Sequence, residues 1–390
     1  RSAEARACRS LPCNLPHRTS VVYRALHAST GTLVALKVGH DSVSNEIAIL
    51  QRLSKDDTPT PGLLWYAFFA EDDDEQEDGD ASKQASSQQL LACEWCAVGS
   101  AEACLGHVRF PVRWLAVIAE NLFGALDVVH GKGVLHRDVK PANLLIARDG
   151  TVRLADFSLA CEGETSRDFV GTFQFLAPER LRGREYGPPA DVWSAALTLL
   201  VLRLDGVPAN LFRADEDFWP ALEFYEDPRL YDKALSERST LSSRDDAEEE
   251  ENDEESSFRG FVESRLAADP LKRPRRWRED PWLSRRWTVA ERRLHLAPLA
   301  PSMASRLADL RGILGILRRD DVLVPDFGPA QLRNLADSFD LPESTVRAAL
   351  HDSPLRLAAS PLCCCRGLSR GLSRGLSRGL SRGLSRGLSR

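Results

Sequence analysis

Three polar residues near the middle of the chain have the types and the spacing that phosphoryl transfer requires. The segment His136–Asn143 has the sequence HRDVKPAN, and Asp156 follows it at the start of an Asp-Phe pair. Asp138 could orient an attacking hydroxyl and accept its proton, and Asn143 and Asp156 could offer the hard oxygen ligands that magnesium prefers. The chemistry indicated is transfer of the terminal phosphate of ATP to an alcohol.

This segment resembles the catalytic loop of the eukaryotic protein kinase family, where an Asn stands five positions after the Asp of His-Arg-Asp and an Asp-Phe-Gly motif follows. Only the final glycine differs, because Ser158 occupies its position. Lys140 and Thr172 are similar to the serine/threonine-specific form of the family, and Gly171–Trp193 is similar to the MAP kinase kinase branch. The resemblance implies a serine/threonine protein kinase that uses ATP and Mg²⁺ and acts on protein substrates.

The resemblance also implies an α+β, bilobal protein kinase fold over residues 20–285. We expect a small β-rich N-lobe at residues 20–96 and a larger helical C-lobe at residues 97–285. A small helical region at residues 302–357 should follow, either packed on the C-lobe or free to dock a partner. Residues 1–19 stay unassigned, and the Arg-Gly-Leu-Ser repeat of residues 366–390 should be disordered because it cannot build a core.

The N-lobe should carry the residues that hold the nucleotide. The apolar runs Val21–Ala25 and Thr32–Val38 predict a β-hairpin. Its second strand contains Lys37 in a Val-Ala-Leu-Lys sequence, and the resemblance implies that this lysine binds the α and β phosphates. Glu46 opens a helical pattern and is the candidate partner of Lys37. Lys37 and Glu46 are closer in sequence than the family usually shows. Either the helix that carries Glu46 is shortened, or Lys37 pairs with a different residue.

Two further segments lead toward the catalytic loop. The apolar run Leu90–Cys96 resembles the strand and hinge that receive adenine, which implies that backbone groups near Glu94 and Cys96 bind the base. The Cys93 and Cys96 thiols form a Cys-x-x-Cys sequence, but with no second ligand pair we expect buried thiols and no zinc site. Helical periodicity over Val112–Gly131 predicts a long helix before the catalytic loop.

Segments after the catalytic loop are similar to those that stabilise the catalytic loop of a kinase and control its activation. The resemblance implies that Asp191 supports the backbone of the catalytic loop and that Arg273 pairs with Glu179 of the Ala-Pro-Glu motif; a buried pair of this kind leaves a stranded charge if either partner is lost. It implies that Lys140 neutralises charge on the transferred phosphoryl group. The activation segment contains Thr172.

Arg137 stands beside the catalytic aspartate, as in kinases that are switched on by phosphorylation. A phosphate on the activation segment can pair with such a guanidinium and order the segment. Thr165 and Ser166 are the candidate acceptors, so the resemblance implies an upstream activating kinase as a partner.

The glycine-rich loop that covers ATP in the family has no clear counterpart. Its three glycine positions correspond to Leu15, His17 and Ser20, although glycine is what allows the backbone to approach the phosphates closely. Either ATP is held weakly or the first residues do not represent the natural protein. We favour the second, since the chain begins with Arg and its only methionine is Met303. The alternative function is a pseudokinase scaffold with weak nucleotide binding.

Composition argues against several other classes of protein. The 390 residues carry a net charge of -6, so no general basic surface is available for nucleic acid. The best apolar run, Ala195–Leu202, falls well short of the roughly 18 residues of a membrane span. Nine unevenly spaced cysteines do not form the framework of a secreted domain, which favours the cytoplasm, with the nucleus as the alternative.

Negative charge is concentrated in two runs. We expect the first, Glu71–Asp80, to be a disordered insertion between two N-lobe strands, because a segment so charged cannot bury a core. The second, Asp245–Glu255, is predicted to be a solvated loop, with a docking site for basic partners as the alternative.

Overall fold

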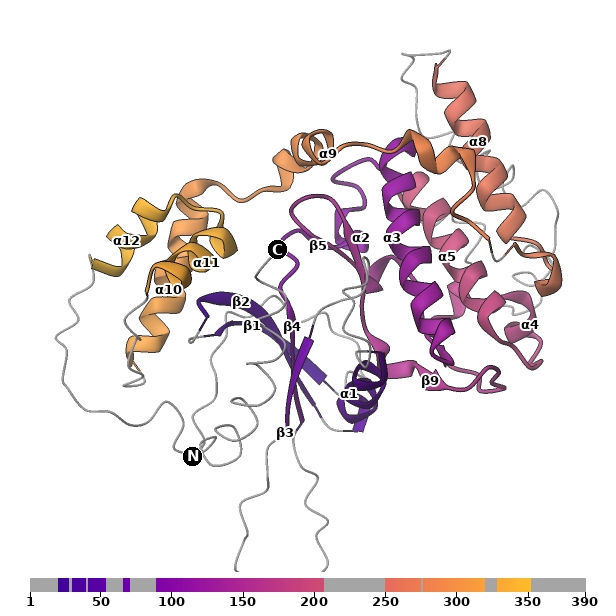
Figure 1. Ribbon diagram of the computed structural model, residues 1–390, viewed down its shortest axis with the longest axis horizontal. Coiled ribbons are helices and arrows are strands. Elements are labelled where there is room, and N and C mark those ends of the chain that lie inside the picture. The colour runs from indigo at the N-terminus through magenta and orange to yellow at the C-terminus, as the bar shows by residue number, and fades with distance from the viewer. Residues whose placement is uncertain are drawn as a thin grey trace, which may run out of the picture. The chain divides into compact units, whose positions relative to one another are not determined.

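The computed structural model has a β-rich N-terminal region and a mostly helical remainder, as expected (Figure 1). Its contacts divide the chain into two units, which are described separately. The first unit contains Arg1–Ile47, Trp65–Trp95 and Pro301–Arg390, and the second contains Ala48–Leu64 and Cys96–Ala300. The structure describes residues 20–27, 30–39, 41–53, 66–70, 89–206, 250–274, 276–319 and 328–351.

A four-stranded antiparallel sheet with the order β1-β2-β4-β3 is the frame of the first unit. The strands are β1 (Ser20–His27), β2 (Thr32–Gly39), β3 (Tyr66–Ala70) and β4 (Gln89–Glu94). The predicted hairpin is confirmed: β1 pairs with β2 in a register that places His27 opposite Thr32. Gly31 closes the turn with a positive φ of 73°, a conformation that glycine adopts at no steric cost. Helix α1 (Asp41–Leu53) begins after β2.

Three C-terminal helices belong to this first unit: α10 (Met303–Arg319), α11 (Pro329–Phe339) and α12 (Glu343–His351). They lie within the small helical region expected at residues 302–357, and Asp340 ends α11 with a left-handed φ of 51°. Apolar residues of α11 recur at Leu332, Leu335 and Phe339, which is the spacing of one helix face.

That apolar face packs against β2, a contact that the sequence did not indicate. Leu33 of β2 joins the core that the three helices form. Hydrogen bonds also join α11 to the hairpin. The Leu33 amide donates to Ser338 Oγ at 3.2 Å, and Asn334 Nδ2 donates to the Thr30 carbonyl at 2.9 Å. Arg24 of β1 also pairs with Asp309 of α10 at 3.1 Å. The hairpin that carries Lys37 is therefore supported by the C-terminal helices.

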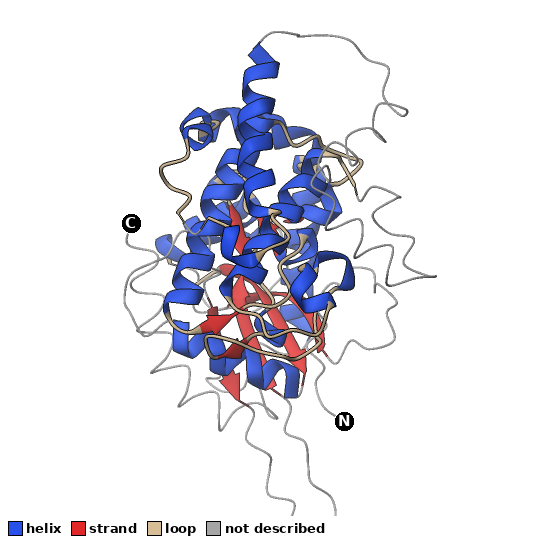
Figure 2. Ribbon diagram, turned by 90° about the vertical axis from the view of Figure 1, so that its right-hand side faces the viewer, coloured by secondary structure: helices blue, strands red, loops and turns tan. Residues whose placement is uncertain are grey.

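The second unit is built on three helices that pack around aromatic side chains. They are α3 (Val112–Gly131), α5 (Pro188–Arg203) and α8 (Glu250–Arg265), which Figure 1 labels and which are among the blue helices of Figure 2. Helix α3 has the bounds predicted from periodicity. The rings of Phe123 and Phe261 meet edge to face at 5.4 Å. Trp114 and Trp193 are fully buried. The shorter helices are α2 (Ala101–Cys104), α4 (Pro178–Leu181) and α9 (Val289–Leu296).

Two small sheets flank the catalytic loop of this unit. One has the order β5-β7-β8, with β5 (Gly99–Ser100), β7 (Leu144–Ile146) and β8 (Val152–Leu154). The other pairs β6 (Val134–Leu135) with β9 (Cys161–Glu162). The strands β6 and β7 stand directly before and after the HRDVKPAN segment, and β8 ends just before Asp156, so these short strands fix both ends of the loop.

The described part of the second acidic run is not the predicted solvated loop. Residues Glu250–Glu255 form the first turns of α8, and residues 245–249 lie outside the described residues. Glu255 also pairs with Arg203 of α5 at 2.7 Å. This ion pair fastens the start of α8 to α5.

Within the described residues, no helix is long and apolar enough to cross a membrane. The same residues contain no group of three or more His, Cys, Asp or Glu that could hold a metal ion. Residues 1–19, the acidic run 71–80 and the repeat 366–390 lie outside the described residues.

We predict that Leu335→Ala destabilises the first unit, because Leu335 is fully buried in the core shared with β2. Loss of a buried leucine side chain costs about 2–5 kcal/mol, which should lower Tm by at least about 4 °C. Thermal melting monitored by circular dichroism measures the change. Leu294→Ala is the control, since Leu294 is 78% exposed. Equal melting temperatures of the two variants would contradict the packing of α11.

Candidate active site

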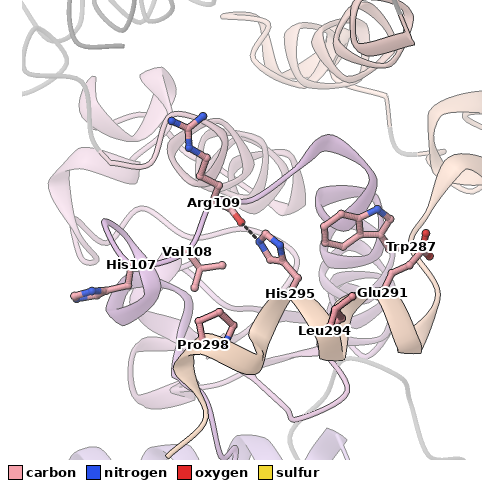
Figure 3. A pocket seen from close by; sticks show the side chains of 8 residues that line it. All are labelled: His107, Val108, Arg109, Trp287, Glu291, Leu294, His295 and Pro298. Carbon is pink, nitrogen blue, oxygen red and sulfur yellow. Dashed lines mark hydrogen bonds between the residues drawn. The ribbon is translucent and has the colours of Figure 1, made fainter. Parts of the chain in front are cut away.

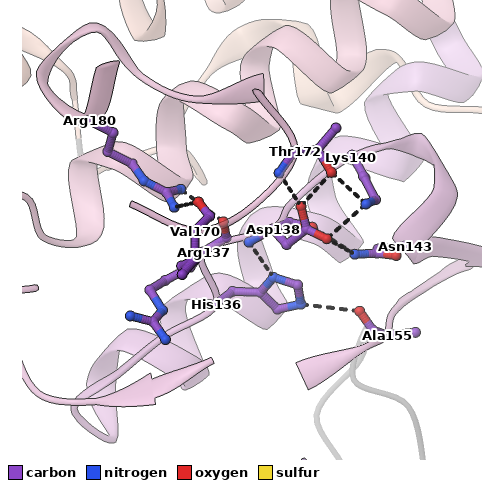
Figure 4. Close-up of polar contacts among 9 residues, drawn as sticks. All are labelled: His136, Arg137, Asp138, Lys140, Asn143, Ala155, Val170, Thr172 and Arg180. Atoms are coloured by element: carbon purple, nitrogen blue, oxygen red, sulfur yellow. Dashed lines mark hydrogen bonds and ion pairs between the residues drawn. The ribbon is translucent and has the colours of Figure 1, made fainter. Parts of the chain in front are cut away.

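The carboxylate of Asp138 is held by four hydrogen-bond donors (Figure 4). Its Oδ1 accepts from the amide and the hydroxyl of Thr172, both at 2.8 Å. Its Oδ2 accepts from Asn143 Nδ2 at 3.1 Å and pairs with Lys140 Nζ at 2.8 Å. A carboxylate offers about four lone-pair positions, so these donors fix its orientation. Asp138 is 7% exposed.

Asn143 is oriented so that its oxygen can serve a metal ion. The residue closes the short helix η1 (Pro141–Asn143), and its Nδ2 donates both to Asp138 Oδ2 and to the Asp138 carbonyl, the latter at 2.8 Å. The amide nitrogen is thus engaged, and Oδ1 is the atom that could coordinate magnesium. Magnesium in such sites is held by one or two side-chain oxygens together with substrate phosphates and water, so Asn143 and Asp156 fit the donor set.

Asp156 stands on strained backbone that a buried histidine supports. Its φ is 63°, in the left-handed region that non-glycine residues rarely adopt. The ring of His136 lies next to it in the fold: Nε2 contacts the Ala155 carbonyl at 3.1 Å, and the ring stacks edge to face on Phe157 at 4.7 Å. Burial lowers the pKa of His136, which favours the neutral ring. No role for His136 was predicted, and its place beside Arg137 is the one signal in the sequence.

Asp191 of α5 holds the backbone of the catalytic loop, as predicted. Its Oδ1 accepts from the Arg137 amide and its Oδ2 from the His136 amide, each at 2.9 Å. His130 Nε2 lies 2.8 Å from the same Oδ2. Burial alone would raise the pKa of Asp191, but these donors outweigh it and bring the pKa to about 2. Arg137 has a φ of 70°, and this bond to Asp191 stabilises that conformation.

The pair predicted between Arg273 and Glu179 is present and bidentate. Nη1 donates to Oε1 at 2.6 Å and Nη2 donates to Oε2 at 2.8 Å. Both side chains are buried, and Arg273 also donates to the carbonyls of Ala267 and Pro189. The pair joins the Ala-Pro-Glu segment to the loop after α8.

Arg180 is another buried arginine, and its role was not predicted from the sequence. Its Nη1 donates to the Arg137 carbonyl at 2.8 Å, and its Nη2 donates to the Val170 carbonyl at 2.5 Å. The guanidinium also lies over the Tyr186 ring at 4.6 Å. Arg180 therefore joins the catalytic loop to the activation segment. Its position directly after Glu179 was the one available signal.

The candidate phosphate acceptors have different surroundings. Thr165 is exposed and its hydroxyl donates to Glu185 at 3.0 Å. Ser166 Oγ accepts from Arg137 Nη1 at 3.2 Å. The same guanidinium nitrogen pairs with Asp168 at 2.7 Å, a residue that the sequence analysis left without a role.

In the first unit, Lys37 Nζ pairs with Glu46 Oε2 at 2.6 Å, so α1 is long enough to present the expected partner. The two side chains are 14% and 4% exposed. Strand β4 ends at Glu94, and Cys96 is buried at the start of the second unit. Phosphate binding by Lys37 and adenine binding near Glu94 and Cys96 stay predictions.

A surface hollow elsewhere in the second unit contains none of these residues (Figure 3). His295 anchors it, with Nε2 2.7 Å from the Arg109 carbonyl and its ring edge to face with Trp287 at 5.0 Å. Its lining is His107, Val108, Arg109, Trp287, Glu291, Leu294, His295 and Pro298.

Comparison with known proteins places this site in a family. The protein kinase domain model matches residues 18–283, which is more than half of the chain. The chain therefore belongs to the protein kinase domain family, and the predicted fold class is confirmed.

Several relatives are MAP kinase kinases, in line with the resemblance of the activation segment. The chain is 32% identical over 204 residues to the mitogen-activated protein kinase kinase mkk2 of Aspergillus fumigatus, covering 50% of this chain and 39% of the relative. It is 34% identical over 137 residues to the MAP kinase kinase skh1/pek1 of Schizosaccharomyces pombe, covering 33% and 38%. It is also 30% identical over 244 residues to calcium-dependent protein kinase 2 of Zea mays, covering 61% and 40%. The chain thus spans about two fifths of the length of these relatives.

We predict that Asp191→Asn weakens both stability and activity. An asparagine turns an NH₂ group toward one of the two backbone amides, so the free energy of unfolding should fall by about 2 kcal/mol. The folded-state pKa of Asp191, about 2, lies below its usual value. Its stabilising effect is therefore complete above about pH 4 and is lost as the pH falls toward 2.

Urea unfolding at several pH values measures this effect. The difference between wild type and Asp191→Asn should be constant from about pH 5 to 8 and should narrow below about pH 4. Asp269→Asn is the control, because the exposed Asp269 accepts only the Leu271 amide at a helix cap, where asparagine serves equally well. A difference that grew toward low pH would contradict the role of the charged carboxylate.

Proposed function

We propose that this chain is a serine/threonine protein kinase, which transfers the γ-phosphate of Mg-ATP to hydroxyl groups of protein substrates. The observation that carries the proposal is the fixed carboxylate of Asp138, bonded to Thr172, Lys140 and Asn143. A structural carboxylate has no need of a lysine and an asparagine amide together with an activation-segment hydroxyl. This arrangement suits a general base that must meet an incoming alcohol.

Each side chain has a distinct role in this reaction. A substrate hydroxyl enters by displacing the longest of the bonds to Asp138, the 3.1 Å bond from Asn143, and donates its proton to Oδ2. Lys140 Nζ lies 2.8 Å from Asp138 Oδ2 and 2.6 Å from Thr172 Oγ, so it places positive charge beside the reacting oxygen. Thr172 keeps the carboxylate turned toward the substrate.

The proposed reaction needs ATP and Mg²⁺, and the family resemblance indicates which residues would hold each of them. ATP supplies the phosphoryl group, and Mg²⁺ neutralises charge on it. Lys37, fixed by Glu46, would bind phosphate oxygens, and Asn143 and Asp156 would hold the magnesium ion. Backbone groups near Glu94 and Cys96 would receive the adenine.

The relatives suggest which proteins serve as substrates. Those named MAP kinase kinases act, by name, on other protein kinases, so we propose that the substrate of this chain is itself a kinase. Such a relay belongs in the cytoplasm or the nucleus. Among the described cysteines, Cys104 and Cys161 carry thiols that form no disulfide, which suits a reducing compartment.

We predict that Asp138→Asn reduces phosphate transfer to the background level. Radiolabelled ATP with a generic basic protein as acceptor measures the reaction, and the loss should be on the order of 100-fold or more for removal of a general base. Asp205→Asn is the matched control, because the exposed Asp205 has a left-handed φ of 58° that asparagine tolerates. Background incorporation by wild type, equal to that of Asp138→Asn, would favour the scaffold alternative instead.

A further inference from the structure

The guanidinium of Arg137 already has an acidic partner in the unmodified chain. Nη1 lies 2.7 Å from Asp168 Oδ2, and Nε donates to the Leu159 carbonyl at 2.6 Å. The Arg137 side chain is 9% exposed, whereas that of Asp168 is 66% exposed. A cation withdrawn from water in this way requires a nearby anion, and Asp168 provides one.

Asp168 is held in turn by its neighbours in the activation segment. Its amide donates to Ser166 Oγ at 3.2 Å, and its carbonyl accepts from the Tyr186 hydroxyl at 2.9 Å. Ser166 and Tyr186 form a two-way backbone bridge, with N to O distances of 2.9 and 3.0 Å. The segment around Asp168 is thus tied to the region that leads into α5.

The same segment reaches the catalytic aspartate four residues later. Arg180 links the Val170 carbonyl to the Arg137 carbonyl. At Gly171 the φ is 98°, and an added Cβ would lie 2.5 Å from the Arg137 carbonyl oxygen, so only glycine allows this approach. Thr172 then donates twice to Asp138. A shift at Asp168 would therefore move the donors that orient the catalytic carboxylate.

A phosphate beside Arg137 would lie next to the negative charge of the Asp168 carboxylate. Ser166 Oγ lies 3.3 Å from Asp168 Oδ2, and a phosphoserine carries a charge of about -1.5 to -2 near pH 7. Two anions this close repel each other, so phosphorylation of Ser166 would compete with Asp168 for one guanidinium. Thr165 instead donates to Glu185, another acid.

From this geometry we propose that Asp168 does the work of an activating phosphate. It pairs with Arg137 and orders the activation segment, so the unmodified chain is active and needs no upstream kinase at Thr165 or Ser166. Asp168 is a positioning residue: it acts on Asp138 through Arg137, Arg180 and Thr172. The inference rests on the proposed kinase activity and replaces the phosphorylation switch expected from the sequence.

The first test compares kinase activity in phosphatase-treated protein, after removal of the phosphatase. Wild type and Thr165→Ala should keep kcat within about twofold of the untreated protein. Asp168→Asn should lower kcat at least tenfold while the KM for ATP stays unchanged, and Asp168→Glu should restore most of kcat. Arg167→Gln is the control, because Arg167 is adjacent and exposed, with only a 3.8 Å contact to Glu185.

The second test does not depend on activity. Hydrogen exchange measured by mass spectrometry should be faster over residues 161–172 in Asp168→Asn than in wild type or Arg167→Gln, with unchanged exchange over α3 as evidence of folding. Unchanged exchange over residues 161–172 in Asp168→Asn would overturn the inference, whatever the activity.

The two proposals fail in different ways. If wild type is active only before phosphatase treatment, the proposed function stands and the role of Asp168 is overturned. If wild type matches Asp138→Asn before and after treatment, the proposed function fails, and hydrogen exchange alone decides whether Asp168 orders the segment.

Discussion

The hydrogen bonds from two backbone amides to the Asp191 carboxylate are the constraint on which the site depends. They place Arg137 on left-handed backbone, a conformation that costs energy for any residue with a side chain. Asp191 projects from α5, which packs against α3 in the buried core. The packing of the second unit therefore offsets the backbone strain at Arg137. The carboxylate of Asp138, next in the chain, takes its direction from this fixed backbone.

Arg137 connects three parts of the second unit through three different groups. Its amide bonds to Asp191, its carbonyl accepts from Arg180, and its side chain pairs with Asp168. The scaffold, the Ala-Pro-Glu segment and the activation segment therefore converge on one residue. Since these groups cannot move independently, the arrangement behaves as a unit, and loss of one contact should weaken the others.

The candidate catalytic groups could be proposed from sequence because they lie close together in the chain or follow recognisable motifs. Asn143 reaches Asp138 within five residues, and α3 follows a clear helical period. The placement of α10–α12 could not be predicted, because the apolar face of α11 shows that a partner is needed without identifying it. Leu33 became that partner through a contact about 300 residues apart in sequence. The helical start of α8 escaped prediction because a charge run alone does not reveal Arg203 opposite Glu255.

The sequence motif at Arg137 correctly indicated an anion but not its source. A guanidinium beside the catalytic aspartate accepts a phosphate or a carboxylate, and the two differ in charge and in whether another enzyme must supply them. The residues between Ser158 and Gly171 include several acids, and only their folded positions separate Asp168, at 2.7 Å from Arg137, from the others. A carboxylate carries less charge than a phosphate, but two further contacts hold the Asp168 carboxylate in place: the backbone bonds between Ser166 and Tyr186, and the bond from the Tyr186 hydroxyl to the Asp168 carbonyl. Those bonds reduce the ordering that the ion pair must supply, which is why a single carboxylate suffices.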